Sequence, residues 1–392
     1  MAWSDGSISR HGLSTIDIYS IFVTFVAFKR TLTVSSNQLS ASRTIYIHIM
    51  AKSPSVYPYD PSNPLPIVFA VIIFLLAVSL TYQSHRYKWI HFGLMMFWAS
   101  TVWLAGFITR AISAFNPSNV GMFIAQYVLI FVGPPLFAAS EYFILGRLLA
   151  YLPYHTPIHP GRVLTTFLLL SAAVESLAAS GAASSVSANS TPEDRSAAII
   201  RIKASLILQE VLEAGFFGMV ALVEYRCRRA GHFPKNVRIM CRMLYVTSFM
   251  MTIRCIVRTI EGFEATDCDP SAPGFKGYCG PVQEYEWFLW VFEVANITVF
   301  VLLLALFHPG RYLPSNKAHY LDPADGVTER IGPGYSAADN RPLLVTILDP
   351  FNWTGMMTGK GAVVDHFWER ENPVAEKNFA AGKMKRVVDG RV

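Results

Sequence analysis

The sequence predicts an all-α, polytopic membrane protein with seven transmembrane helices. Apolar residues make up 52% of the 392-residue chain and charged residues only 15%. The apolar residues also gather in seven runs, and a membrane span needs about 20 residues because the hydrocarbon core is about 30 Å thick. An ordinary soluble domain carries more charge than this, so a soluble fold is excluded.

The composition also limits the partners and cofactors. The net charge is +6, but the basic residues lie between the apolar runs rather than in one patch, so nucleic acid is excluded as a partner. Membrane lipids and a lipophilic small molecule are the expected partners. The five cysteines form no CxxC or Cys/His spacing, and no glycine-rich phosphate-binding motif is present, so we expect neither a metal nor a cofactor.

The chain divides into a tail, a membrane domain and a second tail. Residues 1–64 are predicted to lie outside the membrane domain, because their one apolar run, 16–28, is too short to span and a proline-rich segment follows at 54–66. Residues 65–307 form the seven-helix domain. The predicted spans are Leu65–Tyr82, Trp89–Ile112, Val120–Leu149, Val163–Ala183, Ala198–Val223, Arg238–Ile260 and Glu286–Phe307.

The charges of the loops predict the orientation. Basic residues follow spans one, three, five and seven, which the positive-inside rule places in the cytosol. The N-terminus is then lumenal or extracellular, and residues 308–392 form a cytosolic tail. Within that tail, the apolar segment 342–357 contains Asp349-Pro350 and is too short to cross, so it is expected to lie on the membrane surface.

Two motifs agree with this orientation. The loop after span four carries the glycosylation sequon Asn189-Ser190-Thr191, and the loop after span six carries Cys268 and Cys279. Both loops fall on the lumenal side, where a disulfide persists. We expect glycosylation at Asn189 and a Cys268–Cys279 disulfide, with two free thiols as the alternative.

A group of carboxylates near the middle of the membrane is the first candidate site. Glu175 lies about 18 Å along its span, and a charge at that depth is costly enough to mark a site in most membrane proteins. Glu210 falls at a similar depth, with Gln209 beside it and Glu213 one turn away. No basic residue is expected at their depth, and crowded carboxylates cannot all ionise, so at least one is expected to carry a proton.

Three roles fit such a group. A neutral carboxylic acid beside an ionised one suits protonation of an epoxide or alkene, which makes Glu175, Glu210 and Glu213 candidate catalytic residues. The same arrangement suits proton-coupled transport. The third reading is structural, with the carboxyls hydrogen-bonding across helices.

Other polar and aromatic residues extend the candidate site. Arg254 and Glu293 both lie about 10 to 12 Å below the lumenal ends of their helices, so they could pair, either as a structural ion pair between helices or as part of the site. Glu141 is expected at the cytosolic interface, neutralised by Arg147 or Arg162. Trp290 belongs to a dense set of rings that form an interfacial belt or line a pocket for a developing cation.

Several segments resemble the fungal lipid-translocating exporter family associated with aminocholesterol resistance. They are GPPLFAASEYFILGR (133–147), RCIVRTIE (254–261) and HPG (308–310). Span four departs from that family's pattern, because Ser171 and Ala178 stand where the family has Asp and Gln, and Glu175 is added. The resemblance implies a seven-helix transporter at the plasma membrane.

Other segments resemble the membrane-bound fungal terpene cyclase and epoxide hydrolase family of the ascofuranone and aurovertin type. They are HPGRVLTTF (159–167), YEWFLWVFE (285–293), HPGRYLPSNKAHYL (308–321) and ILDPF (347–351). This resemblance implies a cofactor-independent enzyme of the endoplasmic reticulum or another endomembrane, acting on an epoxidised terpenoid or polyketide in secondary metabolism. The main prediction is therefore a cyclase or hydrolase, and the alternative is a lipid or toxin exporter.

Overall fold

The computed structural model describes residues 57–156, 160–186, 191–231, 233–268, 278–322, 326 and 328–331. The sequon residue Asn189, the segment 342–357 and the tail up to residue 56 lie outside the described residues. Predictions about those three regions therefore stay predictions.

Seven helices are long and apolar enough to cross a membrane, which confirms the predicted number. The first six are α2 (Pro64–Arg86), α3 (Ile90–Phe115), α4 (Val120–Tyr151), α5 (Pro160–Val186), α6 (Pro192–Arg229) and α7 (Lys235–Asp267). The seventh span is composite and consists of α9 (Glu286–Phe288), the π-helix η2 (Leu289–Ala295) and α10 (Asn296–Leu306). The short pieces are η1 (Pro153–His155), α8 (Pro281–Glu284), η3 (Pro309–Arg311) and the antiparallel strands β1 (His319–Leu321) and β2 (Glu329–Ile331).

Several helices are longer than the predicted spans. Helix α6 has 38 residues and begins with a capping box, in which the Thr191 hydroxyl accepts from the Asp194 amide and the Asp194 carboxylate accepts from the Thr191 amide. A 38-residue helix is about 57 Å long, far more than the hydrocarbon core. The helices therefore extend beyond the membrane, and hydropathy alone did not mark their ends.

Helix α4 carries Pro134 and Pro135 in its interior without breaking. The two proline rings remove the amide donors that the carbonyls of Ile130 and Phe131 would otherwise receive. Gly133, next to them, lets α3 approach closely, because a Cβ there would lie 2.4 Å from Cδ1 of Trp103. This part of α4 is thus both tightly packed and rich in backbone acceptors.

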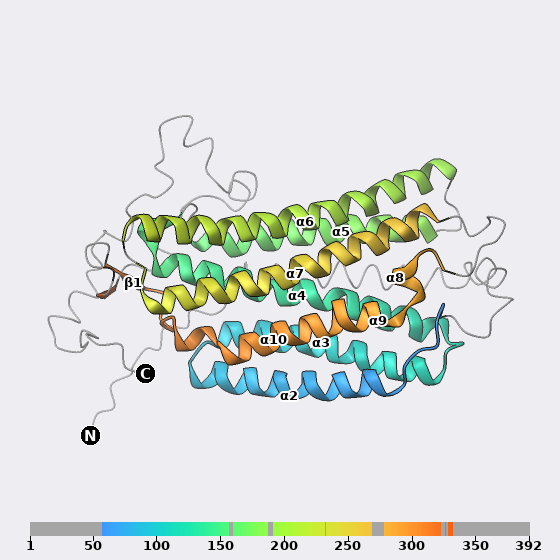
Figure 1. Cartoon of the computed structure of the whole chain (residues 1–392), viewed down its shortest axis with the longest axis horizontal. Coiled ribbons are helices and arrows are strands. Elements are labelled where there is room, and N and C mark those ends of the chain that lie inside the picture. The colour runs from blue at the N-terminus through green and yellow to red at the C-terminus, as the bar shows by residue number, and fades with distance from the viewer. Residues whose placement is uncertain are drawn as a thin grey trace, which may run out of the picture.

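The seven helices pack in two groups (Figure 1). The first group contains α2, α3 and α4 with α9–α10, and the second contains α5, α6 and α7. The groups meet where α4 packs on α5, α6 and α7 and where α10 packs on α7. We call the end with β1 and β2 the hairpin end, and the opposite end, with the Cys268–Cys279 disulfide, the disulfide end.

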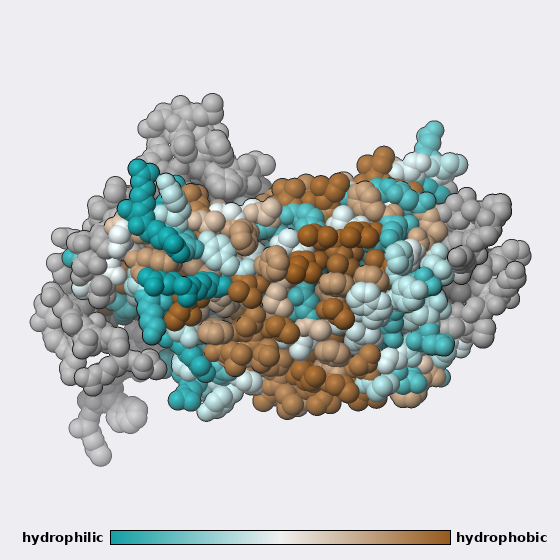
Figure 2. All heavy atoms as spheres, viewed as in Figure 1, coloured by the Kyte–Doolittle hydropathy of each residue, from teal (hydrophilic) through white to brown (hydrophobic). Residues whose placement is uncertain are grey.

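The surface and the core agree with a membrane setting. Hydrophobic side chains form a band across the middle of the visible face, and hydrophilic ones gather toward both ends (Figure 2). The first span contributes to the exposed apolar surface through side chains such as Phe74 and Leu75, which are 54% and 61% exposed. The core consists largely of aromatic and aliphatic residues, including Phe92, Trp103, Phe107, Phe137, Phe216 and Phe300.

Candidate functional site

Charged residues from five helical elements gather where the two helix groups meet. We call this set the charged seam, and its members are Glu141 of α4, Glu175 of α5, Glu210 and Glu213 of α6, Arg254 and Arg258 of α7 and Glu293 of η2. Charges inside a membrane protein are costly unless they face other helices, so their collection at one interface is the main feature of the interior.

The part of the seam nearest the disulfide end is an arginine–carboxylate network. Arg254 Nε donates to Glu293 Oε1 at 2.8 Å, and Arg258 Nε lies 3.3 Å from Glu293 Oε2. All three residues are buried, with 7% exposure or less. The predicted Arg254–Glu293 pairing is therefore present. It joins α7 of the second group to the seventh span of the first.

Arg258 makes further contacts that complete this network. Its Nη1 atom donates to Glu261 Oε2 at 2.6 Å, one turn along α7. Its guanidinium also lies over the rings of Tyr127 and Phe131 of α4, 5.7 and 5.0 Å from their centroids. Such stacking is typical of arginine and stabilises a buried guanidinium. Each cation of the network thus has at least one carboxylate partner.

Glu293 and Trp290 lie on the π-helix η2. A π-helix adds a residue to a helical turn and often occurs at functional sites. The Trp290 ring stacks on Phe69 at a centroid distance of 5.4 Å, and the Trp290 Nε1 atom has no acceptor among the described residues. Trp290 is 6% exposed, so it belongs to the interior, whereas Trp98 and Trp287 are about half exposed, as a membrane belt requires.

Glu141 does not have Arg147, one of its two expected arginine partners, as its neighbour. It is fully buried, and the Thr247 hydroxyl lies near it. That hydroxyl donates to the carbonyls of Met243 and Leu244, so neither carboxyl oxygen accepts a hydrogen bond in the described part of the chain. Its charged neighbour is Glu213, not Arg147, which instead donates to the carbonyls of Pro314 and Ser315. The depth was counted from Val120, but α4 is about 48 Å long, so distance along it does not give position in the membrane.

Glu213 is 2% exposed and points toward α4, where the Tyr142 side chain lies beside it. Its Oε2 atom is also without a hydrogen-bond donor among the described residues. Tyr142 packs on Phe216 at a centroid distance of 5.4 Å, which fixes α6 against α4 at this depth. Glu141 and Glu213 are therefore two buried carboxyls on facing helices with little compensation from hydrogen bonds.

The other members of the predicted group are less buried. Glu210 accepts a long hydrogen bond from the Thr259 hydroxyl of α7 at 3.5 Å, and Gln209 beside it makes no hydrogen bond among the described residues. Glu175 is partly exposed on α5, and its nearest cations are Arg254 and Arg258. The prediction that these carboxylates have no basic residue at their depth is wrong, because Arg254 interacts electrostatically with both Glu175 and Glu213.

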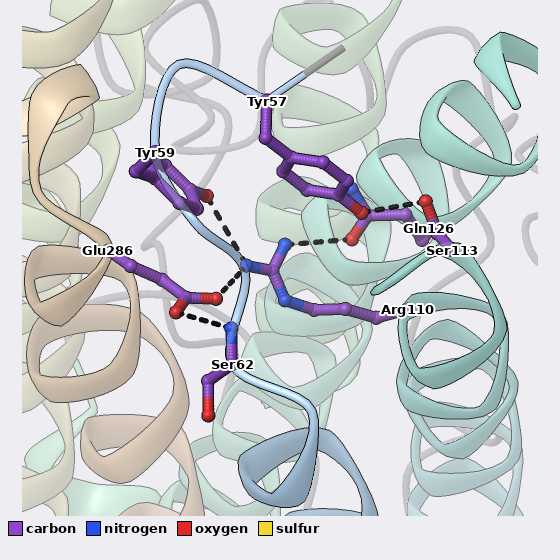
Figure 3. Close-up of polar contacts among 7 residues, drawn as sticks. All are labelled: Tyr57, Tyr59, Ser62, Arg110, Ser113, Gln126 and Glu286. Atoms are coloured by element: carbon purple, nitrogen blue, oxygen red, sulfur yellow. Dashed lines mark hydrogen bonds and ion pairs between the residues drawn. The ribbon is translucent and has the colours of Figure 1, made fainter. Parts of the chain in front are cut away.

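Sequence reasoning missed another buried arginine, Arg110. Arg110 of α3 is 2% exposed and donates to Gln126 Oε1 at 3.0 Å and to Glu286 Oε1 at 2.5 Å (Figure 3). Its guanidinium lies 5.3 Å from the centroid of Trp290. The available signal was a single arginine within a 26-residue apolar helix, but the sequence does not show which partners it meets.

The seam can provide charge and hydrogen-bonding groups inside the membrane, but its carboxyl groups are not arranged as a metal site in the described part of the chain. Among the residues that the structure describes, no group of three or more His, Cys, Asp or Glu side chains is placed to hold a metal ion. A polar group entering the bundle would meet arginine donors nearer the disulfide end and carboxyl groups deeper in the bundle. The fold and the seam therefore define an integral membrane protein with a polar interface between two helix groups.

The comparisons with known proteins agree with that class and add the family. Residues 96–316 match the family model described as RTA1 like protein. This range covers more than half of the chain and includes six of the seven spans in whole or in part, so the chain belongs to the RTA1-like family. The match supports the resemblance to lipid-translocating exporters and gives no support to the predicted terpene cyclase assignment.

Three relatives illustrate the family. The chain is 29% identical over 308 residues to a protein of Leptosphaeria maculans named lipid-translocating exporter-like protein RTA1, covering 75% of this chain and 58% of that relative. It is 24% identical over 266 residues to a protein of the same name from Ajellomyces capsulatus, covering 64% of this chain and 79% of the relative. It is 25% identical over 301 residues to protoporphyrin uptake protein 1 of Saccharomyces cerevisiae, covering 64% of this chain and 91% of that relative. No solved structure matches the chain.

Proposed function

We propose that this protein moves a lipid, or a lipophilic small molecule of similar character, across the membrane in which it lies. The observation that carries the proposal is the family match over residues 96–316, together with relatives that are named for lipid translocation. A relative named for protoporphyrin uptake supports a substrate class that is lipophilic and carries a polar group. For an exporter, we place the protein in the plasma membrane, with the hairpin end cytosolic.

In this proposal the charged seam serves the polar part of the substrate. The headgroup of a lipid has to pass through a hydrocarbon core that offers it no hydrogen bonds. The interface between the two helix groups holds two arginines and five carboxyl groups, and Glu141 and Glu213 retain oxygens without donors among the described residues. Buried unpaired groups of this kind reduce stability, and we infer that they are retained because transport uses them.

The cyclase or hydrolase reading gives a different expectation for the same residues. It assigns Glu175, Glu210 and Glu213 to proton transfer toward an epoxide and predicts a chemical product. The transport reading predicts that the substrate is recovered unchanged on the other side of the membrane. The two readings are therefore separated by analysing the substrate after the assay.

The test uses the full chain reconstituted in phosphatidylcholine vesicles with a trace of fluorescent NBD-labelled phosphatidylcholine. Dithionite bleaches only the outer leaflet, so the rate at which protected fluorescence becomes bleachable measures translocation. We expect protein-containing vesicles to translocate the probe, or protoporphyrin in a parallel experiment, at least about tenfold faster than empty vesicles. If vesicles with and without protein translocate each probe at the same rate, the proposal is contradicted. Conversion of an epoxide by the protein-containing vesicles would favour the enzyme.

A pair of variants ties translocation to the seam. Glu293→Gln removes the carboxylate that joins Arg254 and Arg258, and we expect it to slow translocation at least about tenfold. Lys203→Gln is the matched control, because it removes another ion pair between helices, to Asp267, that is partly exposed and lies outside the seam. Equal rates for the two variants would remove the seam from the transport mechanism.

A further inference from the structure

The first described residues of the chain cross the disulfide end of the bundle. Residues 57–63, which we call the strap, precede α2 and contact α3, α4 and α9 (Figure 3). The Tyr57 hydroxyl donates to Ser113 Oγ at 2.7 Å, and the Tyr57 ring meets Phe123 of α4 edge to face at 4.9 Å. Tyr57 is 5% exposed, so the strap is built into the bundle rather than lying loosely on it.

Arg110 and Glu286 hold the strap in place. Arg110 Nη2 donates to the Tyr59 hydroxyl at 3.3 Å and to Glu286 Oε1, and Glu286 Oε2 accepts from the Ser62 amide at 2.9 Å. The guanidinium also lies 5.7 Å from the centroid of Tyr57. We call Arg110 and Glu286 the latch. Charge-assisted hydrogen bonds between buried groups are among the stronger polar interactions in proteins.

The latch is linked to the charged seam through one short helical segment. Glu286 begins α9 and Glu293 lies seven residues later in η2, on the same continuous span. Glu286 is bound by α3 of the first helix group, whereas Glu293 is bound by Arg254 and Arg258 of the second. Trp290, between the two carboxylates, lies under the Arg110 guanidinium. Release of Glu286 would therefore free one of the two carboxylates of this segment from its ion pair.

We propose that the strap closes the disulfide end of the charged seam, and that the Arg110–Glu286 latch must open for a lipophilic substrate to enter or leave there. The proposal rests on the proposed function in naming the substrate. Arg110 is a positioning residue in this scheme, because it acts by holding the strap and the start of the seventh span. Opening of the latch would expose the Arg254 side of the seam to water at this end.

Two cysteines report the two parts of the proposal. Ser62→Cys places a thiol on the strap and keeps the backbone amide that Glu286 binds. Cys255 is a natural free cysteine beside Arg254, only 2% exposed. The full chain is reconstituted in phosphatidylcholine vesicles and treated with a charged, impermeant thiol reagent, and mass spectrometry gives the labelling rate at each position. The measurement needs no transport, so a failed transport assay leaves it interpretable.

The Arg110→Gln change is made in the protein that already carries Ser62→Cys. We expect it to raise the labelling rates at position 62 and at Cys255 at least about tenfold. Loss of a charge-assisted hydrogen bond shifts the equilibrium between the closed and the open latch by about that factor. Lys203→Gln, at the same end of the bundle, should change neither rate by more than about twofold. If Arg110→Gln does not fold, Tyr59→Phe removes only one hydroxyl contact to the latch and should raise both rates about threefold.

Two results would overturn the proposal. Unchanged labelling of Ser62→Cys in a folded latch variant would show that Arg110 does not hold the strap. Faster labelling of Ser62→Cys with Cys255 still protected would show that the strap opens without exposing the seam.

Discussion

The two parts of the charged seam surround a buried carboxyl group in different ways. Toward the disulfide end, Glu293 lies between two arginines, at 2.8 Å from Arg254 and 3.3 Å from Arg258. Deeper in the bundle, Glu141 is just as buried but accepts no hydrogen bond in the described part of the chain, and its charged neighbour is another carboxyl, Glu213. Two arginines compensate the Glu293 carboxylate, whereas neither oxygen of Glu141 has a hydrogen-bond donor in the described part of the chain.

The two kinds of buried carboxyl group have different effects on the stability of the fold. A buried ion pair fixes the register of two helices, although its net contribution to stability is small because desolvation offsets the attraction. A buried carboxyl without donors contributes nothing to stability in either form and reduces it when ionised. Folding therefore does not explain its presence in the bundle, and the transport function that we propose gives it a role.

The largest expected loss of stability comes from breaking the ion pair between Arg254 and Glu293. Arg254→Met leaves Glu293 with one of its two arginines, and we expect the free energy of unfolding to fall by about 3 kcal/mol, since breaking one side of a buried ion pair is strongly destabilising. The measurement is thermal unfolding in detergent. The double variant Arg254→Met/Glu293→Met should recover most of the loss, and a double variant no more stable than the single one would argue against pairing as the cause.

Amide substitutions compare the two parts directly. Glu293→Gln should reduce the free energy of unfolding by about 2 kcal/mol, because two arginines lose their shared carboxylate. Glu141→Gln should change it by less than about 0.5 kcal/mol or raise it, because no donor or cation is lost. The same unfolding assay serves both variants. Equal losses would mean that Glu141 has partners in the folded protein that compensate its charge.

The smallest effect lies outside the membrane, at the hairpin. The Glu329 carboxylate lies 3.5 Å from Nδ1 of His319 and accepts from the Tyr151 hydroxyl at 2.8 Å, and these contacts lower the pKa of Glu329. A carboxyl whose pKa is lower in the folded state stabilises the fold above its unfolded pKa of about 4.5, and this contribution is lost as the pH falls through the lower, folded value.

Hydrogen exchange checks this prediction. Amides of β1 and β2 should lose protection when the pH falls from 6 to about 3, after correction for the intrinsic exchange rate. Glu329→Gln should make the protection nearly independent of pH in that range. A pH dependence that is the same in the variant would assign the effect to another group.

Much of the fold was predictable, because a membrane imposes a simple rule on sequence. Seven apolar runs predicted seven helices, and equal depth predicted that Arg254 and Glu293 pair. The ends of the helices were not predictable in the same way. Helix α6 begins at the Thr191–Asp194 capping box, whose residues are polar and carry no hydropathy signal.

The rest of the site could not be predicted, because it depends on how the helices rotate and where each crosses the membrane. Glu141 lies beside Glu213 only because α4 packs against α6, and the distance along α4 does not reveal this. The π-helix that carries Glu293 has no sequence signature, and Arg110 meets Glu286 across 176 residues of chain. These contacts are long-range, and a single sequence contains no direct record of them.

The translocation rate of the Glu141→Gln variant in phosphatidylcholine vesicles with NBD-labelled phosphatidylcholine tests most directly whether this buried carboxyl serves transport. We predict a protein that folds at least as stably as the wild type but translocates the lipid at least about tenfold more slowly, because we infer that the Glu141 carboxyl serves transport and not folding. A Glu141→Gln protein that is equally stable and translocates at the wild-type rate would contradict the central claim.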